Sequence, residues 1–460
     1  MRLLHSSDWH LGQFFIGQSR AAEHQAFFAW LRQQIITHQV DVLLVAGDIF
    51  DTSTPPSYAR ELYHQLIVDL QPTGVQIIML GGNHDSVAVL QESASLLQCL
   101  HTHVIPGLAP DLKQHLVPIY TQDTDNTTAS NTKKLSAIIA AMPYLRPRDL
   151  SQRDDGKREA GASIQDKQQQ LQQQISAVYQ DIYQAAQTMA AQLAPGEQIP
   201  IIGTGHFTTV GASRSESERD LYIGTLAAFP AQALPPFCYM ALGHIHQPQK
   251  VAQTEHIRYC GSPIALSFTE ANHDKQVLLV DIATPTQDAA AVHVTPLTVP
   301  CFQPLASVRS TIAQLADTLA PHLEALATGQ QLWLELVVTG EDALLMDLNT
   351  PLQAIVADLP VQLLKIRRER PAQHGQSGEA SVLALTELTP ADVIAQRLGQ
   401  ESLPDSTRER FIELHQIAWQ QVLAAEPIAA ELTAAEPTGS PADSDLSVAA
   451  ESATTAEHSA

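Results

Sequence analysis

Histidine, aspartate and asparagine side chains follow five apolar runs of this sequence at the point where each run ends. They are Asp8 and His10 after "RLLHSS", Asp48 after "VDVLLVAG", Asn83 after "VQIIMLGG", His206 after "QIPIIGTG", and His244 and His246 beside "YMALG". Imidazole nitrogens with carboxylate and amide oxygens suit divalent metal ions. One tetrahedral zinc ion takes about four ligands, so a set of this size predicts two ions.

A two-ion site needs a ligand that both ions share, because such ions lie about 3.5 to 4 Å apart. A carboxylate can bridge them with its two oxygens, and Asp48 follows a run that reads as a central strand. We therefore predict that Asp48 is the bridge. The mixed nitrogen and oxygen donors favour Mn²⁺ over Ca²⁺. Two such ions would activate a water molecule for the hydrolysis of a phosphate ester.

The segment "MLGGNHDSV" places three polar side chains after an apolar run, where a core has no need of them. Asn83 is predicted to offer its amide oxygen to one ion, while the adjacent His84 can protonate the oxygen of the leaving group. A histidine in that role needs an acid to hold its tautomer, and Asp51 is the candidate. The alternative is a plain Gly-Asn turn, which would leave the other strand ends unexplained.

The sequence contains two His-x-His pairs, and their positions separate them. His244 and His246 follow an apolar run, so alternation along the strand puts both rings on one side at its carboxyl end. His101 and His103 precede an apolar run instead. We interpret this second pair as surface histidines.

The candidate ligands can meet only if the strands that carry them run in parallel. The first hundred residues alternate apolar runs with helical patterns at 19–38 and 57–70, which is the βαβαβ pattern of a parallel sheet covered by helices. Ligands of such sheets bind at the carboxyl ends of the strands. Residues 121–134 read as an exposed loop, and residues 164–193 as a Gln-rich helix whose apolar stripe packs on the core.

Five further apolar runs are predicted to add strands or extended segments to the sheet structure of the first domain. They are "SAIIAAMPYL", "QIPIIGTGHF", "CYMALGHIHQP", "RYCGSPIALSF" and "KQVLLVDI". The pattern of the first domain closes near residue 297.

A second, small α+β domain is predicted at residues 298–370. Its expected helices lie at 307–327 and 349–358, and its expected strands are "QQLWLELVV" and "VQLLKIRRE". Residues 371–425 read as a loop followed by two helices, which could pack on their own domain or on a partner helix. Residues 426–460 lack a sustained apolar period and should be disordered.

The net charge of −23 argues against a protein that grips nucleic acid over a broad surface. The acidic tail at residues 426–460 contains seven acidic residues and no Lys or Arg. The dense basic cluster is limited to residues 365–370. The four cysteines are widely spaced and read as reduced, packed thiols. No signal peptide or membrane helix is recognisable, so we expect a cytoplasmic protein.

The motifs "DWH", "GDIFD", "GGNHD", "GHF" and "GHIH", in this order, resemble the calcineurin-like metallophosphoesterase superfamily. The stretches "GDIFDTSTPPSYAR", "MPYLRPRD" and "YCGSPIALSFTE" are similar to its branch of DNA nucleases that work with a coiled-coil ATPase. The resemblance implies an α/β fold in which a β-sandwich is flanked by helices. It further implies a nuclease domain at residues 1–297, a capping domain at 298–370 and a segment at 371–425 that docks on the ATPase.

The same resemblance implies a role for each candidate residue. One metal ion would be held by Asp8, His10, Asp48 and His246, a second by Asp48, Asn83, His206 and His244, and His84 would be the catalytic histidine. The implied activity is Mn²⁺-dependent exonuclease and hairpin or single-strand endonuclease action on DNA, in repair, recombination and replication. The implied assembly is a homodimer within a heterotetramer that includes the ATPase.

Three other functions compete with this interpretation. A phosphodiesterase for cyclic nucleotides or other small esters would share the site motifs but would need neither the second domain nor docking helices. A metal-free scaffold would have lost some ligands, and all of them are present. A protein phosphatase would carry Arg after Asp51, where this chain has Thr52.

Overall fold

The computed structural model describes residues 1–122, 133–151, 163–213, 218, 228–283, 292–369 and 410–411. The chain divides into two units, Met1–Pro371 and Ala372–Ala460. Almost all described residues belong to the first unit. The loop and two helices predicted at 371–425 and the tail at 426–460 lie outside the described residues, apart from a fragment of helix at 410–411.

The first sheet has the strand order β14-β13-β1-β4-β5-β6. Its parallel strands are β1 (Arg2–Ser6), β4 (Val42–Val45), β5 (Gln76–Leu80) and β6 (Thr102–Ile105), and β13 (Gln276–Ile282) and β14 (Val292–Thr298) run antiparallel at one edge. Helices α1 (Ala21–His38), α2 (Ser57–Leu70) and α3 (Val87–Gln98) pack on this sheet. The expected helices at 19–38 and 57–70 are therefore present to within two residues.

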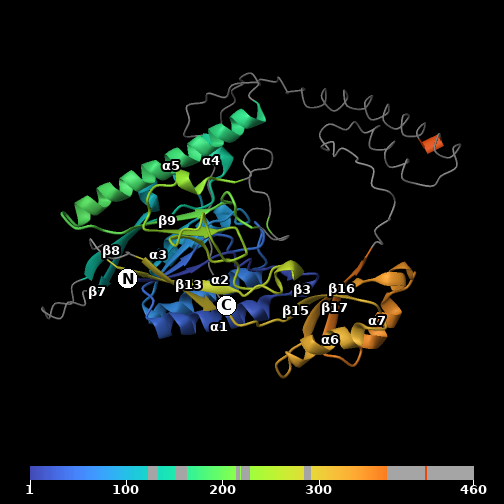
Figure 1. Ribbon diagram of the computed structural model, residues 1–460. Coiled ribbons are helices and arrows are strands. Elements are labelled where there is room, and N and C mark those ends of the chain that lie inside the picture. The colour runs from blue at the N-terminus through green and yellow to red at the C-terminus, as the bar shows by residue number, and fades with distance from the viewer. Residues whose placement is uncertain are drawn as a thin grey trace, which may run out of the picture. The chain divides into compact units, whose positions relative to one another are not determined.

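The second sheet has the order β11-β12-β10-β9-β8-β7. Its strands are β7 (Leu116–Gln122), β8 (Lys133–Ala140), β9 (Ile201–His206), β10 (Tyr239–Gly243), β11 (Gln249–Lys250) and β12 (Ile257–Tyr259). The long helix α5 (Ile164–Leu193) packs on this sheet, and the short helix α4 (Pro147–Ser151) precedes it (Figure 1). The apolar stripe predicted for α5 lies in the same hydrophobic cluster as β8 and β9, so it is packing surface.

The two sheets face each other, and alternation along the strands explains why both of their faces are apolar. In β4, Leu43 and Val45 point to the cluster formed with α1 and α2, whereas Val42 and Leu44 point to a cluster shared with the second sheet. A strand buried on both faces reads as a continuous apolar run, as "VLLV" does. The expected α/β fold with a β-sandwich flanked by helices is confirmed.

A smaller sheet of three parallel strands follows, in the order β15-β16-β17. Its elements are β15 (Leu305–Ser310), α6 (Leu315–Glu324), β16 (Leu332–Val338), α7 (Asn349–Val356) and β17 (Val361–Arg368). The expected helix at 307–327 is wrong at its start, because residues 307–310 belong to β15. This strand is short, and only Ala306, Val308 and Ser310 are buried. The period of two therefore covers too few residues to stand out from the helical pattern that follows.

The remaining elements are short. The hairpin β2 (Phe14–Phe15) and β3 (Gln18–Ser19) was not predicted, and the 3₁₀ turns are η1 (Gln71–Thr73), η2 (Leu112–His115), η3 (Ala231–Ala233), η4 (Phe268–Glu270) and η5 (Gly340–Leu344). The loop expected at 121–134 lies mostly outside the described residues, but both of its ends belong to strands β7 and β8. Within the described part of the chain, no helix combines the length and apolarity needed to span a membrane.

Candidate metal centre

Five parallel strands, drawn from both sheets, deliver the predicted ligands to one place. The loops after β1 and β4 are tied together by their backbones, since Asp8 N–H donates to Gly47 O at 3.0 Å and His10 N–H donates to Asp48 O at 3.0 Å. The second sheet joins them where His244 N–H donates to Asp8 Oδ1 at 2.9 Å. Segments more than 230 residues apart in the sequence therefore meet at the carboxyl ends of their strands.

Three overlapping groups of side chains have ligand atoms within 4.8 Å of one another. They are Asp8, His10 and His246; His10, Asp48 and His84; and Asp48, His206 and His244. The first and third groups fall within the two ligand sets that the family resemblance implied, and Asp48 belongs to two groups. Their role as metal ligands remains a prediction.

The backbone at this site is strained. Asp8, His10, Asp48 and His244 have φ angles of 55°, 49°, 50° and 92°. Residues other than glycine rarely adopt this left-handed region, and each such residue costs on the order of 1 to 3 kcal/mol. Strain of this kind persists at positions where the geometry of a functional site requires it.

Asp48 lies between the other candidate ligands. Its Oδ2 is 3.2 Å from His206 Nε2 and 3.7 Å from His10 Nε2, and its Oδ1 accepts the His84 N–H at 2.9 Å. The carboxylate therefore faces both flanking groups, as the predicted bridge should.

Asn83 approaches the site from the end of β5. Its Oδ1 lies 2.9 Å from His206 Nε2, and His206 Nδ1 lies 2.8 Å from Ala46 O. The main-chain contact orients the ring so that Nε2, the asparagine oxygen and the Asp48 carboxylate share one side of the site. Asp48, Asn83 and His206 are three of the four ligands predicted for one ion. The fourth, His244, lies in one group with Asp48 and His206.

The chemistry of the donors fits a pair of divalent ions. His10 Nδ1 lies 3.1 Å from Asp51 Oδ1, whereas His10 Nε2 is buried and has no hydrogen-bond partner among the described residues. A buried polar atom without a partner costs about 1 to 3 kcal/mol. A cation held by His10 Nε2 would remove that penalty, and the Asp51 contact would fix the tautomer that leaves Nε2 available.

The ionisable groups at the site shift one another's pKa values. Burial opposes ionisation of Asp48, but the adjacent His206, His84 and His10 outweigh it and hold the pKa of this carboxyl well below its usual value. Burial likewise opposes protonation of His206, and the Asp48 and Asp8 carboxylates raise its pKa to about 9. The buried carboxylates thus create a negative potential that a cation would satisfy.

His84 and Asp51 are in contact, but through a different atom from the one predicted. His84 Nδ1 lies 2.7 Å from the main-chain carbonyl oxygen of Asp51, while the Asp51 carboxylate makes its hydrogen bond with His10. This hydrogen bond of His84 is made by the Asp51 backbone, and the role of the Asp51 carboxylate toward His84 stays a prediction. The turn after β4 directs the Asp51 side chain toward His10 and its carbonyl toward β5.

Three supporting residues were missed or given no role. Asp85 accepts from the N–H groups of Ile49, Phe50 and Gly82 at 2.8 to 3.1 Å, so it fastens the loops after β4 and β5. Glu270 lies 3.3 Å from His246 Nδ1, and Lys275 donates to Glu270 at 2.6 Å. Asp85 stands inside the motif "GGNHD" and could have been found there. The other two lie in "YCGSPIALSFTE" and just beyond it, with no spacing that links them to His246.

The dense basic cluster of the smaller sheet is largely engaged by the protein itself. Glu335 lies 2.9 Å from Lys365 and 3.8 Å from Arg367. Arg368 donates to the carbonyl oxygens of Ala343 and Leu345. These contacts favour a solvated strand face over a ready phosphate-binding surface.

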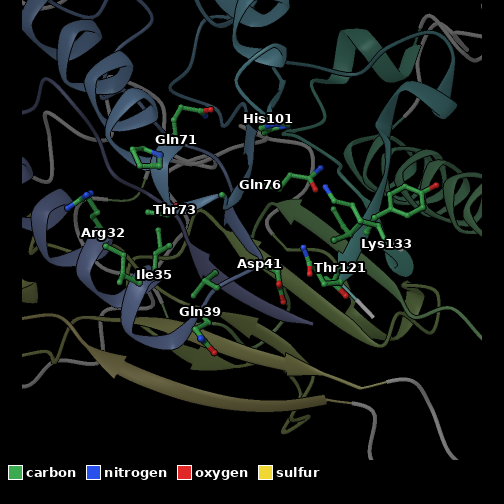
Figure 2. Close-up of a pocket in the computed structure, with 17 residues that line it drawn as sticks. Arg32, Ile35, Gln39, Asp41, Gln71, Thr73, Gln76, His101, Thr121 and Lys133 are labelled. Carbon is green, nitrogen blue, oxygen red and sulfur yellow. The ribbon is translucent and has the colours of Figure 1, made fainter. Parts of the chain in front are cut away.

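A hollow of about 870 Å³ lies at the amino ends of the strands of the first sheet, opposite the ends that carry the candidate ligands (Figure 2). Asp41, Gln76 and His101, which stand at the amino ends of β4, β5 and β6, line it together with Arg32 and Lys133. None of the candidate ligands lines it. This hollow is therefore separate from the metal centre, and the exposed His101 faces it.

Two family models match the chain. Residues 1–248 match the model described as calcineurin-like phosphoesterase, and residues 301–402 match the one described as type 5 capsule protein repressor C-terminal domain. The second match begins within four residues of the boundary predicted at 298.

Several relatives are similar over most of the chain. The SbcD subunit of the nuclease SbcCD from Escherichia coli strain K12 is 41% identical over 416 residues, which are 90% of this chain and 96% of the relative. The same subunit from Rhodobacter capsulatus is 31% identical over 413 residues, 86% of this chain and 94% of the relative. The one from Bacillus subtilis is 29% identical over 294 residues, 63% of this chain and 68% of the relative. The chain belongs to the calcineurin-like phosphoesterases, in the family of the SbcD subunit of the nuclease SbcCD.

Proposed function

We propose that this chain is the nuclease subunit of an SbcCD-type complex and hydrolyses phosphodiester bonds of DNA with two divalent ions. The observation that carries the proposal is the convergence of Asp8, His10, Asp48, His206 and His246 at one buried centre. The relatives are named as nuclease subunits, which supports DNA as the substrate over the small esters that other members of the superfamily hydrolyse.

The candidate residues have separate roles in metal binding, proton donation and orientation of the ligands. Asp8, His10, Asp48 and His246 would hold one ion, and Asp48, Asn83, His206 and His244 the other. Bound there, two ions supply an activated water and neutralise charge on the phosphoryl oxygens. His84, held through Nδ1 by the Asp51 carbonyl, would carry on its other nitrogen the proton that the leaving oxygen needs. The Asp51 carboxylate supports this centre by orienting His10.

The finer points of the proposal concern metal, substrate and partner. The mixed imidazole, carboxylate and amide donors support Mn²⁺. We assign exonuclease and hairpin or single-strand endonuclease action, in DNA repair, recombination and replication. The partner is an SbcC-type coiled-coil ATPase, met by residues 371–425, with two copies of this chain in a heterotetramer. We place the complex in the cytoplasm, where the DNA of the bacterial relatives lies.

The domain boundaries are part of the same proposal. The proposed nuclease domain at 1–297 carries every candidate ligand, and the proposed capping domain at 298–370 would contain the three-stranded sheet. Residues 426–460 form the proposed disordered tail.

The test is the replacement His84→Gln, with Mn²⁺ content and nuclease rate measured on the same preparation. Removal of a proton donor costs about 10²- to 10⁴-fold in rate. Because the replaced ring is assigned to the leaving group, we expect two bound ions per chain and a rate lower by that factor. The control His293→Gln removes an exposed imidazole of β14 and should change neither quantity.

Two results would oppose the proposal. An unchanged nuclease rate in His84→Gln would remove the leaving-group role. Hydrolysis of a cyclic nucleotide by the wild-type chain with Mn²⁺, without nicking of plasmid DNA or opening of hairpins, would favour the small-molecule phosphodiesterase instead.

A further inference from the structure

The 3₁₀ turn η4 places a buried carboxylate behind one of the candidate ligands. Glu270, the last residue of this turn, is fully buried, and its Oε1 lies 3.3 Å from His246 Nδ1. Its Oε2 accepts the main-chain N–H of Leu266 at 3.1 Å and the hydroxyl of Ser262 at 3.3 Å. The side chain is thus fixed through Oε2, while Oε1 faces the imidazole.

A buried lysine balances the charge of this carboxylate. Lys275 is 8% exposed, and its Nζ donates to Glu270 Oε2 at 2.6 Å and to Ser262 Oγ at 2.8 Å. The same Nζ lies 3.4 Å from His246 O. Lys275 therefore contacts both the acid behind the ring and the main chain of the residue that carries the ring.

The pair is too costly to be explained by stability alone. Burying two charges costs several kcal/mol for each ion, and a buried pair can often be replaced by apolar side chains without loss of stability. Lys275 Nζ and Glu270 Oε2 lie 2.6 Å apart where both side chains are buried. A charged pair at this position needs a local reason.

The direction of the imidazole supplies that reason. With Nδ1 turned to Glu270, the ring presents Nε2 to the side shared with Asp8 and His10. A carboxylate on the far nitrogen of a metal-binding histidine fixes the ring and makes it a stronger ligand, and loss of such a partner costs about 10- to 100-fold in metal affinity or activity.

We propose that Glu270 and Lys275 are positioning residues that hold His246 for the divalent ion bound with Asp8 and His10, and so set the affinity of that one site. The inference rests on the proposed function, since it requires the two-ion centre. The histidine ligands His246 and His206, one from each ion site, are then oriented by different kinds of group. His246 is held by a buried ion pair, whereas His206 Nδ1 is held by the main-chain oxygen of Ala46.

The experiment is a calorimetric titration of the metal-free full-length chain with Mn²⁺. In Glu270→Gln we expect two sites, one weakened by about 10- to 100-fold and the other unchanged. The nuclease rate of this variant should return toward the wild-type value as Mn²⁺ is raised, because the reacting groups are intact. The control Glu255→Gln removes an exposed acid paired with Lys250 and should bind as the wild type does.

A second variant covers the case in which Glu270→Gln does not fold. Glu270→Gln with Lys275→Met removes both charges and leaves no buried ion unpaired, and it should show the same weakened site. Two wild-type affinities in either folded variant would overturn the inference while leaving the proposed function intact. A wild-type chain that binds fewer than two ions would instead reject the two-ion centre, and this inference with it.

Discussion

At the scale of single residues, the site is built from side chains that orient one another. Asp51 illustrates this, because its carboxylate contacts His10 and its carbonyl contacts His84. One residue thus supports a candidate ligand and the candidate proton donor through separate atoms. The two functions can be separated by a substitution that changes only the side chain.

Replacing Asp51 with Asn should weaken metal binding more than it impairs proton transfer. The main-chain oxygen that contacts His84 remains, while the negative charge on the His10 side is lost. We expect activity about 10- to 100-fold lower at limiting Mn²⁺ and largely recovered at high Mn²⁺, as rates measured over a range of Mn²⁺ concentrations would show. A loss as deep as that of His84→Gln, and insensitive to Mn²⁺, would contradict this division.

At the scale of elements, the loop after β5 is as important as the side chains that it carries. Gly82 is packed so closely that a Cβ atom there would lie 2.1 Å from Asp48 Oδ1 and 2.3 Å from Asp48 N. Gly82 therefore allows the ends of β4 and β5 to approach each other. Asp85 then fastens the same two loops through three main-chain N–H groups.

The substitution Gly82→Ala should displace Asp48 and weaken both metal sites, since Asp48 faces both groups of candidate ligands. We expect a loss of bound Mn²⁺ together with a loss of nuclease rate, measured by metal analysis after dialysis. Gly196→Ala is the control, because no atom lies within 4 Å of its added Cβ and only the left-handed backbone is disfavoured. That control should cost about 1 kcal/mol of stability and keep its metal. Full metal retention in Gly82→Ala would contradict this prediction, because it would mean that the loop accommodates the added Cβ without displacing Asp48.

At the scale of the whole molecule, the negative net charge opposes the binding of DNA. The chain carries 49 acidic residues against 26 basic ones. Most of the basic cluster on the smaller sheet is engaged by Glu335 or by main-chain oxygens. Two bound divalent ions would add about four positive charges where phosphate must bind, but they would not change the remaining surface.

The isolated chain should therefore bind duplex DNA weakly. We expect a dissociation constant no tighter than the roughly 10⁻⁶ to 10⁻⁴ M typical of non-specific binding at physiological salt, with affinity supplied by the ATPase partner. Filter binding over a range of salt concentrations is the measurement. Nanomolar binding by the chain alone at physiological salt would be incompatible with this electrostatic argument.

Buried histidines that are not candidate metal ligands make the fold sensitive to acid. Burial lowers the pKa of His5 from 6.5 to about 3, and that of His24 to about 4. Below pH 6.5 the unfolded chain binds protons that the folded chain cannot, so the free energy of unfolding falls as the pH is lowered. His5 alone should remove about 2 kcal/mol between pH 8 and pH 5.

The substitution His5→Phe should reduce this pH dependence. It removes the contact with the Tyr239 hydroxyl at every pH, so the informative quantity is the difference in unfolding free energy between pH 8 and pH 5. We expect that difference to shrink by about 2 kcal/mol, measured by urea denaturation in EDTA to exclude metal binding. An unchanged difference would mean that His5 is protonated in the folded chain.

The sequence by itself determined the strands that carry the site and the residues at their ends. Runs such as "VDVLLVAG" and "VQIIMLGG" are apolar because both faces of their strands are buried, and the polar residues that follow stand out against them. The same reasoning failed at residues 307–310, where a short strand with one buried face preceded a helical pattern.

The tertiary structure alone decided which atoms of these residues meet. The Asp51 carboxylate turned to His10 and its carbonyl to His84, and Glu270 reached His246 across 24 residues of chain. Such contacts depend on backbone angles in the left-handed region at Asp8, His10 and Asp48, which residues other than glycine adopt only in a small minority of positions. Local preference can place a side chain at the end of a strand, but its direction there is set by packing between distant segments.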